Sequence, residues 1–380
     1  KGHGMIQKIS KVAMLVLLAA CLVVPVLTMN KDDQIFSDAD NRYLMALPER
    51  ADFDSDQEYR DQLEGYLQDR ISDREQLLSL YGAFNNVAFR YLAHPLYEYG
   101  LDGQAFFWFD ANEDQQVDMD YLTAYADYIQ KMCLYCQDRG TAFVYVNSPE
   151  KKRVYTEYIP DYVPYPLNNF EYLAPLLDER GVPYLDLAGP LTEAHQEGVD
   201  VYNAVYDVGH WNAEGALVGA RAIISYLQEQ GFDVEQPDIE SDYDVVPEHY
   251  DYLPASVLYC PTDTYKYIHK DNGEGAVDVT QDYEPLDLDE HYNTYSLWEN
   301  DACANGLNLL MFQGSYFNTQ GTILYNQFTR TECIQAYMNI FNMDEYYQMF
   351  NPDIVIFESA DYVLSDAYYS YGGLTDTVLN

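Results

Sequence analysis

Buried-strand patterns that alternate with helical patterns place the strongest constraint on how this chain can fold. Apolar runs at residues 141–147 (TAFVYVN), 307–313 (LNLLMFQ) and 352–358 (PDIVIFE) are typical of strands covered on both faces. Helical periodicity is found at residues 121–139, 169–180, 213–230 and around 319–328, and a short strand is expected at 183–187. This alternation predicts an α/β fold with a parallel sheet flanked by helices.

The pattern divides the chain into three regions. Residues 1–30 form an apolar N-terminal segment, and residues 31–118 form a tether and a helical extension with helices expected at 56–69 and 73–92. Residues 119–380 then form the α/β domain. Residues 232–304 interrupt this domain as an acidic, Pro- and Tyr-rich insertion, with a hairpin-like turn at 270–273 (KDNG). We therefore expect one large α/β domain that carries an N-terminal extension.

Residues 12–29 (VAMLVLLAACLVVPVLTM) are nearly all apolar and about long enough to span a bilayer core. Lys8 and Lys11 precede the run, and Asp32 and Asp33 follow it. This asymmetry predicts a single-pass anchor in the cell membrane, with a cytoplasmic N-terminus and an extracytoplasmic body. A cleaved signal peptide or a lipoprotein signal ending at Cys21 is the alternative.

Charge and cysteine usage exclude several classes of function. The chain has 63 acidic and 20 basic residues, a formal net charge of −43, which argues against binding to nucleic acid. The six cysteines are too few and too scattered for a disulfide scaffold. Cys133 and Cys136 form a C-x-x-C inside a helical pattern without a second pair, so we expect buried thiols and no metal site.

Two short motifs at expected strand ends carry the parts of an acyl-transfer site. Ser315 follows Gly314 directly after the strand at 307–313, and Asp207 precedes His210 by three residues, just before the helix at 213–230. In a parallel sheet, side chains at the carboxyl ends of strands meet at one edge. We therefore predict Ser315 as nucleophile, His210 as general base and Asp207 as the group that orients the imidazole. The alternative is that Ser315 and Asp207 only cap helices and that His210 is a packing residue.

Residues beside these motifs are candidates for oxyanion and substrate binding. They are Gly314, Tyr316, Asn147, Lys151 and Trp211. Backbone N–H groups near Ser315 would hold the oxyanion. Lys151 begins a basic island in an acidic chain, which could equally be a solvated turn. This chemistry requires neither a metal nor another cofactor.

Seven stretches, in this order, resemble the DHHW/alginate O-acetyltransferase group (AlgX/AlgJ-like) of the SGNH hydrolase superfamily. They are residues 40–48 (DNRYLMALP), 69–74 (DRISDR), 99–107 (YGLDGQAFF), 148–160 (SPEKKRVYTEYIP), 207–211 (DVGHW), 313–316 (QGSY) and 352–358 (PDIVIFE). As in that group, the His motif precedes the Ser motif, the reverse of the order in ordinary SGNH esterases. The chain differs from the group's pattern where Gln313 precedes Gly314-Ser315 and where Val208 stands two residues before His210.

The resemblance implies an SGNH-like, flavodoxin-like α/β fold and O-acetylation of a cell-surface polysaccharide. It also implies that a multi-pass membrane acyltransferase supplies the acetyl group. A carbohydrate esterase with the same acyl-enzyme is an alternative. A catalytically silent, polysaccharide-binding or scaffold member is another, motivated by the altered Ser motif.

Overall fold

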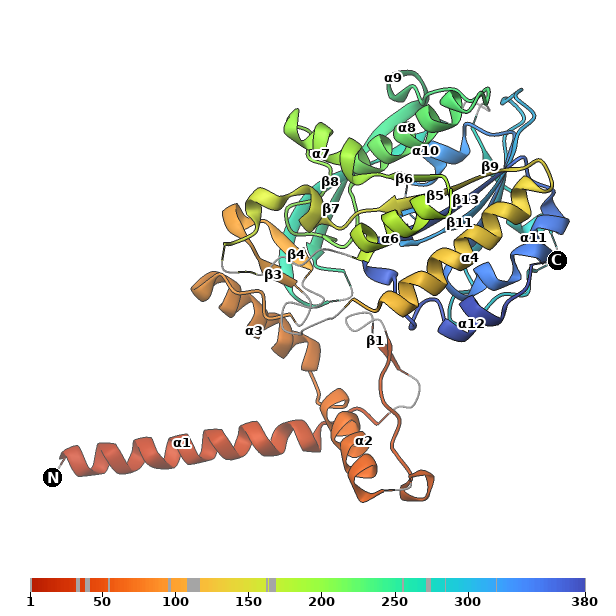
Figure 1. Cartoon of the computed structure of the whole chain (residues 1–380). Coiled ribbons are helices and arrows are strands. Elements are labelled where there is room, and N and C mark those ends of the chain that lie inside the picture. Colours follow the sequence, from red (N-terminus) through yellow and green to blue (C-terminus); the bar gives the residue numbers. More distant parts are fainter. Residues whose placement is uncertain are drawn as a thin grey trace. The chain divides into compact units, whose positions relative to one another are not determined.

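The computed structural model describes residues 2–31, 35–37, 42–53, 55–94, 97–107, 117–161, 163, 169–254, 256–270, 275–283, 285–318 and 320–379. The chain divides into two compact units. The first comprises residues 1–95 and 250–261, and the second comprises residues 96–249 and 262–380 (Figure 1). The predicted turn at 270–273 falls largely on residues outside the described ranges.

The first unit is mainly helical. Its elements are α1 (Gly2–Leu27), β1 (Phe36–Ser37), β2 (Arg42–Tyr43), the 3₁₀ turn η1 (Arg50–Asp52), α2 (Asp56–Asp69) and α3 (Arg74–Phe89). Helix α2 begins where predicted because Ser55 and Glu58 form a reciprocal capping box. At its end, buried Asp69 accepts hydrogen bonds from Arg42 and from the Met45 amide, which fix the preceding extended segment on the helix.

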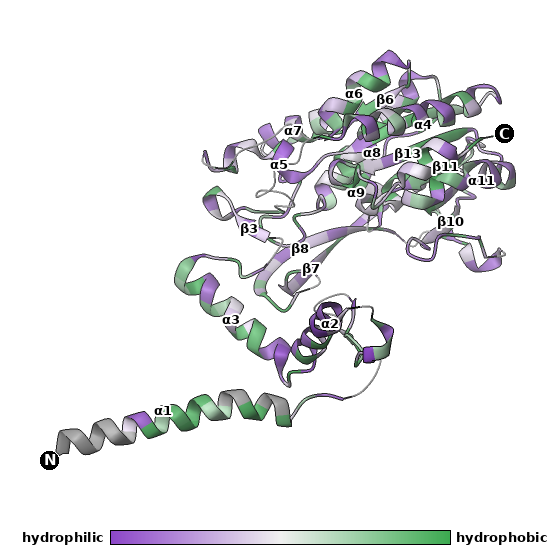
Figure 2. Cartoon of the chain, turned by 60° about the horizontal axis from the view of Figure 1, so that its bottom comes forward, coloured by the Kyte–Doolittle hydropathy of each residue, from purple (hydrophilic) through white to green (hydrophobic). Residues whose placement is uncertain are grey.

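The N-terminal apolar run lies within α1 (Figure 2). Among the helices of the described residues, none combines the length and the apolar character needed to cross a membrane. The predicted membrane span at residues 12–29 is therefore not supported.

The second unit is built on a seven-stranded sheet in the order β6-β5-β13-β11-β12-β10-β9. The strands are β5 (Ala142–Ser148), β6 (Tyr184–Asp186), β9 (Val277–Asp278), β10 (Tyr295–Glu299), β11 (Asn308–Gln313), β12 (Arg330–Gln335) and β13 (Ile354–Ala360). The five strands from β6 to β12 in this order are parallel, and β10 and β9 extend one edge in antiparallel pairing. The predicted α/β fold with a mainly parallel sheet is confirmed.

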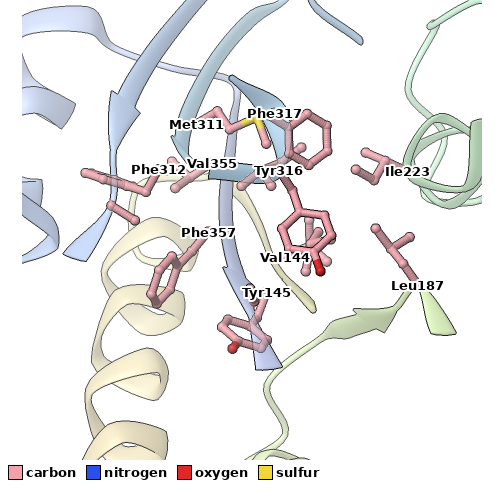
Figure 3. Close-up of a cluster of buried hydrophobic side chains, with 14 of the residues drawn as sticks. Val144, Tyr145, Leu187, Ile223, Met311, Phe312, Tyr316, Phe317, Val355 and Phe357 are labelled. Atoms are coloured by element: carbon pink, nitrogen blue, oxygen red, sulfur yellow. The ribbon is translucent and has the colours of Figure 1, made fainter. Parts of the chain in front are cut away.

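Helices cover both faces of this sheet. They are α4 (Met119–Gln137), α5 (Lys151–Val154), α6 (Asn169–Glu179), α7 (Ala188–Gln196), α8 (Ala213–Glu229), α9 (Ile239–Asp242), α10 (Thr322–Tyr325), α11 (Met343–Phe350) and α12 (Tyr371–Asp376). Helix α4 packs against α6 and α12, whereas α8 packs against α7 and α10. Phe357 and Tyr145 point toward α4, where both contact Tyr125, and Ile223 of α8 lies on the opposite side of the sheet (Figure 3).

Short elements complete the second unit. They are β3 (Tyr97–Tyr99), β4 (Ala105–Phe107) and the 3₁₀ turns η2 (Leu101–Gly103), η3 (Thr156–Tyr158), η4 (Thr280–Asp282), η5 (Ser315–Phe317), η6 (Tyr337–Asn342) and η7 (Asp361–Val363). Strands β7 (Tyr243–Tyr252) and β8 (Tyr259–His269) pair with each other, and residues 250–261 at their tip belong to the first unit.

Two expected boundaries differ from the structure. The second unit begins at residue 96 rather than 119, because β3 and β4 pair within it. Residues 232–304 are not a separate insertion, since β9 and β10 from this segment join the main sheet. Strand β10 is half-buried, so its alternation was less conspicuous than the apolar runs of β11 and β13.

Candidate active site

His210 lies in the irregular segment that leads into α8. Asn212 ends this segment as the N-cap of α8, where its side chain accepts a hydrogen bond from the Gly215 amide at 3.0 Å. Asp207 has a positive φ of 48°, and its backbone oxygen accepts a hydrogen bond from the His210 amide. This tight turn directs the Asp207 side chain back toward the imidazole.

Ser315 lies directly beyond the carboxyl end of β11. Strand β11 is central in the sheet, and Gly314 separates it from η5, which begins at Ser315. Because the chain turns here at the end of a buried strand, the Ser315 hydroxyl is brought to the edge of the sheet where parallel strands end.

The three residues predicted to act together form one hydrogen-bonded row. His210 Nε2 is 2.8 Å from Ser315 Oγ, and His210 Nδ1 is 2.7 Å from Asp207 Oδ1. Each imidazole nitrogen therefore has one partner, the hydroxyl on one side and the carboxylate on the other. This is the geometry that a serine nucleophile, its general base and the orienting acid require.

The pKa of His210 is raised above the ordinary histidine value. Burial acts in the opposite direction, but the hydrogen bond to Asp207 and the charges of Asp207 and Glu358 outweigh it. The imidazolium form is thus stabilised, which favours a histidine that accepts a proton from Ser315 during attack.

Trp211 and Tyr316 pack beside the row formed by Asp207, His210 and Ser315, and they do not line the reacting groups. The Trp211 Nε1–H donates to the backbone oxygen of Tyr316 at 2.9 Å, and the two rings meet edge to face. The Tyr316 hydroxyl donates to the backbone oxygen of Pro149 at 2.8 Å, while its ring packs against the imidazole of His210. Both side chains are buried, so their predicted role in substrate binding is replaced by a positioning role.

Asn147 belongs to a separate buried network. Its Nδ2 donates to Asp361 Oδ1 at 2.8 Å and to Asp186 Oδ1 at 3.1 Å. Arg153 pairs with the same two carboxylates at 2.8 and 3.2 Å. The Asn147 amide is thus committed to joining β5, β6 and the end of β13, and the structure does not bring it to Ser315.

Lys151 is also committed to other groups. It is 2% exposed, and its Nζ donates to Gln104 Oε1 and to the backbone oxygens of Ala105, Asn203 and Ala204 at 2.7 to 3.0 Å. These bonds join β4 to the segment that carries Asp207 and His210. Burial lowers the pKa of Lys151 to about 7, and these bonds give its amino group a structural role, so its predicted substrate-binding role stays a prediction.

Gly314 does not offer its N–H to a substrate in this structure. That N–H donates to Glu358 Oε2 at 2.5 Å. The donor is occupied by a carboxyl group here, and the predicted oxyanion role of the Gly314 amide stays a prediction. The sequence showed that Glu358 ends a strand, but not that its side chain points under Gly314.

A pocket lies next to the row formed by Asp207, His210 and Ser315. It is lined by Phe106, Phe107, Glu150, Lys151, Lys152, Val208, Gly209 and Tyr362. The Tyr362 hydroxyl is 3.4 Å from Ser315 Oγ, a neighbour that the sequence analysis missed. Its place just after the β13 strand end was the available signal, but one tyrosine among 39 carries no distinctive pattern. Within the described ranges, no group of three or more His, Cys, Asp or Glu side chains is arranged to hold a metal ion.

Comparison with known proteins gives the family context of this geometry. Residues 103–249 match the family model described as SGNH hydrolase-like domain, acetyltransferase AlgX. This match confirms the resemblance that the motifs predicted. At the family level it supports an acyl-transferring enzyme. No curated protein sequence matches the chain.

Two solved structures are similar to this chain. PatB1 from Bacillus cereus, in a structure with a sulfonyl adduct, is 15% identical with a TM-score of 0.52, over 71% of this chain and 95% of that one. The O-acetyltransferase domain of AlgJ from Pseudomonas putida is 16% identical with a TM-score of 0.48, over 71% of this chain and 92% of that one. At such identities the PatB1 similarity shows a common fold alone.

Proposed function

We propose that this protein transfers acetyl groups to a cell-surface polysaccharide through an acetyl-Ser315 intermediate. The observation that carries the proposal is the row in which His210 joins Ser315 Oγ at 2.8 Å and Asp207 at 2.7 Å. The family match to acetyltransferase AlgX supports the choice of acyl group and of a polysaccharide acceptor. A silent member would not need this alignment of three polar side chains.

The first half-reaction forms the acyl-enzyme. Ser315 Oγ attacks the acetyl carbonyl carbon as its proton passes to His210 Nε2, and the Nδ1–H bond to Asp207 stabilises the resulting imidazolium. The tetrahedral intermediate then collapses, its bond to the donor breaks, and His210 returns the proton to the leaving group. The products are acetyl-Ser315 and the deacylated donor.

The second half-reaction uses the same groups in reverse. A sugar hydroxyl gives its proton to His210 Nε2 and attacks the acetyl carbonyl, and the new tetrahedral intermediate expels Ser315 Oγ, which takes the proton back. Water in place of the sugar would make the protein an esterase. The aromatic walls of the adjacent pocket, Phe106, Phe107 and Tyr362, suit a sugar ring, because apolar C–H faces pack on aromatic rings.

The proposal includes the cellular setting. We infer that the reaction takes place outside the cytoplasm, where the polymer is found, and that a membrane acyltransferase delivers the acetyl group. Both inferences rest on the resemblance to the AlgX/AlgJ-like group.

The first experiment detects the acyl-enzyme. The purified full chain is incubated with p-nitrophenyl acetate, quenched and examined by intact mass, and Ser315→Ala is treated in parallel. We expect an added acetyl group on the wild type and none on Ser315→Ala. Ser225→Ala is a matched control, because Ser225 lies exposed on α8 and makes only a surface hydrogen bond with Gln236.

Acceptor trials separate transfer from hydrolysis. Oligosaccharides added to the acetylated enzyme should remove the acetyl group faster than water does and gain it themselves, as measured by mass. Loss at the rate in water, with no acetylated sugar, would identify an esterase. Absence of a Ser315-dependent adduct would overturn the acyl-enzyme proposal.

A further inference from the structure

Glu358 is a buried carboxyl group beside the nucleophile that the reaction above leaves without a role. It lies near the end of the central strand β13, with 0% exposure. Its Oε2 accepts the Gly314 N–H at 2.5 Å, while Oε1 has no hydrogen-bond partner in the described part of the chain. Within that part no lysine, arginine or histidine forms an ion pair with it.

The absence of a side chain at Gly314 lets the Glu358 carboxyl group approach closely. A Cβ built on Gly314 would lie 3.0 Å from Glu358 Oε2, tighter than ordinary van der Waals contact. The carboxyl group therefore holds the Gly314 amide, immediately before Ser315, by a hydrogen bond. Since β11 and β13 are neighbouring parallel strands, this bond ties the nucleophile turn to the middle of the sheet.

His210 is the other titratable group that Glu358 affects at neutral pH. The charge of Glu358 contributes to the raised pKa of His210. The remaining titratable groups that face Glu358 are the phenols of Tyr145, Tyr325, Tyr337, Tyr362 and Tyr369, whose pKa values burial raises. Burial also raises the pKa of Glu358 to about 7, partly offset first by the Ser148 hydroxyl and then by the Gly314 amide and by His210.

We propose that Glu358 is a positioning residue for the acyl transfer, which holds Ser315 Oγ on His210 through the Gly314 amide. The proposal rests on the proposed function for its biological meaning. The placement of Ser315 and the effect of Glu358 on His210 can both be measured without acetyl transfer.

Glu358→Gln removes the negative charge but keeps the hydrogen bond to Gly314, because its amide oxygen still accepts the Gly314 N–H in nearly the same volume. The pKa of His210 is measured by NMR titration of histidine-labelled full-length protein, with the resonance assigned from its loss in His210→Gln. We expect a lower His210 pKa in Glu358→Gln. Glu332→Gln is the matched control, since Glu332 is also a buried strand carboxyl with a pKa raised to about 7 by burial, but it has no part in the shift of His210.

Glu358→Ala removes the hydrogen bond to the Gly314 amide. Phenylmethanesulfonyl fluoride, which reacts with an activated serine, reports on the placement of Ser315 when the rate of the mass increase is followed. We expect about a tenfold slower rate in Glu358→Ala, because a buried amide loses its only partner, and a smaller change in Glu358→Gln. Thermal melting shows whether each variant is folded. If Glu358→Ala is unfolded, the sulfonylation rate is measured in Glu358→Asp, whose shorter side chain loosens the same bond. That rate then shows whether the bond to Gly314 positions Ser315.

The outcomes distinguish the two proposals. Sulfonylation at the wild-type rate in a folded variant that lacks the bond to Gly314 would overturn the role of Glu358. Expected shifts in a protein that never forms acetyl-Ser315 would overturn the proposed function and leave the role of Glu358 standing.

Discussion

The indole Nε1–H of Trp211 donates to the backbone oxygen of Tyr316 at 2.9 Å, and this bond joins the residue after His210 to the residue after Ser315. The base and the nucleophile come from segments about a hundred residues apart in the sequence. His210 Nε2 and Ser315 Oγ are only 2.8 Å apart, and the bond from the Trp211 side chain to the Tyr316 backbone links the two segments next to them.

Trp211→Phe should weaken both stability and catalysis. The change keeps an aromatic ring but leaves the buried Tyr316 oxygen without its donor, which costs about 1 to 3 kcal/mol. We expect lower unfolding free energy in urea and slower acetylation of Ser315. Trp298→Phe is the control, because Trp298 donates a comparable bond to Ser296 at 2.8 Å on β10, away from Ser315. Equal acetylation rates in the two variants would contradict the prediction.

The rate of Ser315 acetylation should fall at acid pH. Because the folded pKa of His210 is raised above the ordinary value, the imidazole becomes protonated, and unable to accept a proton, already at pH values above that ordinary value. Asp207→Asn removes the charge that raises this pKa, so the acid limb should move to lower pH while the maximal rate drops. Stopped-flow release of p-nitrophenol across pH measures both effects. An acid limb at the same pH in Asp207→Asn would show that another group controls it.

The His210–Asp207 pair should stabilise the fold more at acid than at alkaline pH. A histidine whose folded pKa exceeds its unfolded pKa contributes stability that is fully present below the unfolded value and is lost as pH rises through the folded value. The difference in unfolding free energy between wild type and Asp207→Asn should therefore shrink from pH 5 to pH 9, as urea titrations at each pH would measure. A difference that grows with pH would be inconsistent with this pair.

Lys151→Met should destabilise the second unit. The change removes the partner of four oxygens that surround a 2% exposed ammonium, at a cost of about 2 to 4 kcal/mol. Lys266→Met, which breaks a more exposed pair with Glu248, should cost about 1 kcal/mol or less. Urea unfolding compares the two. If Lys151→Met is as stable as the wild type but binds the sugar acceptor more weakly, Lys151 has a substrate-binding role instead.

Gly314→Ala should slow acetylation of Ser315. The added methyl group lies 3.0 Å from Glu358 Oε2, so the turn before the nucleophile has to shift. Gly189→Ala is the control, because a Cβ at this position of α7 meets nothing within 4 Å. The pre-steady-state acetylation rate of each folded variant tests the idea. A Gly314→Ala rate equal to that of Gly189→Ala would show that the turn tolerates a side chain.

Periodicity was sufficient to predict the central sheet and most of its helices. Strands β5, β11 and β13 are continuous apolar runs, and α2, α6 and α8 have clear helical spacing with caps or glycine stops, so their bounds differ from the predictions by no more than a few residues. Strand β10 was missed because it is an edge-side strand with mixed composition inside an acidic segment. Antiparallel pairing at a sheet edge is a tertiary property that local patterns do not encode.

The candidate site was predictable in its reacting residues but not in its surroundings. Ser315 follows the end of β11, as predicted, whereas His210 and Asp207 lie in the irregular segment before α8 and not at a strand end. The partners of Asn147 depend on its direction near the end of β5, which a one-residue change in register would reverse, and those of Lys151 depend on where α5 begins. The contact of Tyr362 with Ser315 likewise follows from how the chain turns after β13, and no local pattern marks it.

The positive φ of 48° at Asp207 limits which amino acids fit this position, apart from any role in the reaction. Asparagine and aspartate enter the left-handed region most readily among residues with a side chain, because a short polar group can hydrogen-bond locally. Of the two acidic amino acids, the backbone thus prefers the shorter one. A glutamate would enter this conformation at a higher energetic cost. The backbone conformation and the bond to His210 therefore both favour aspartate at this position.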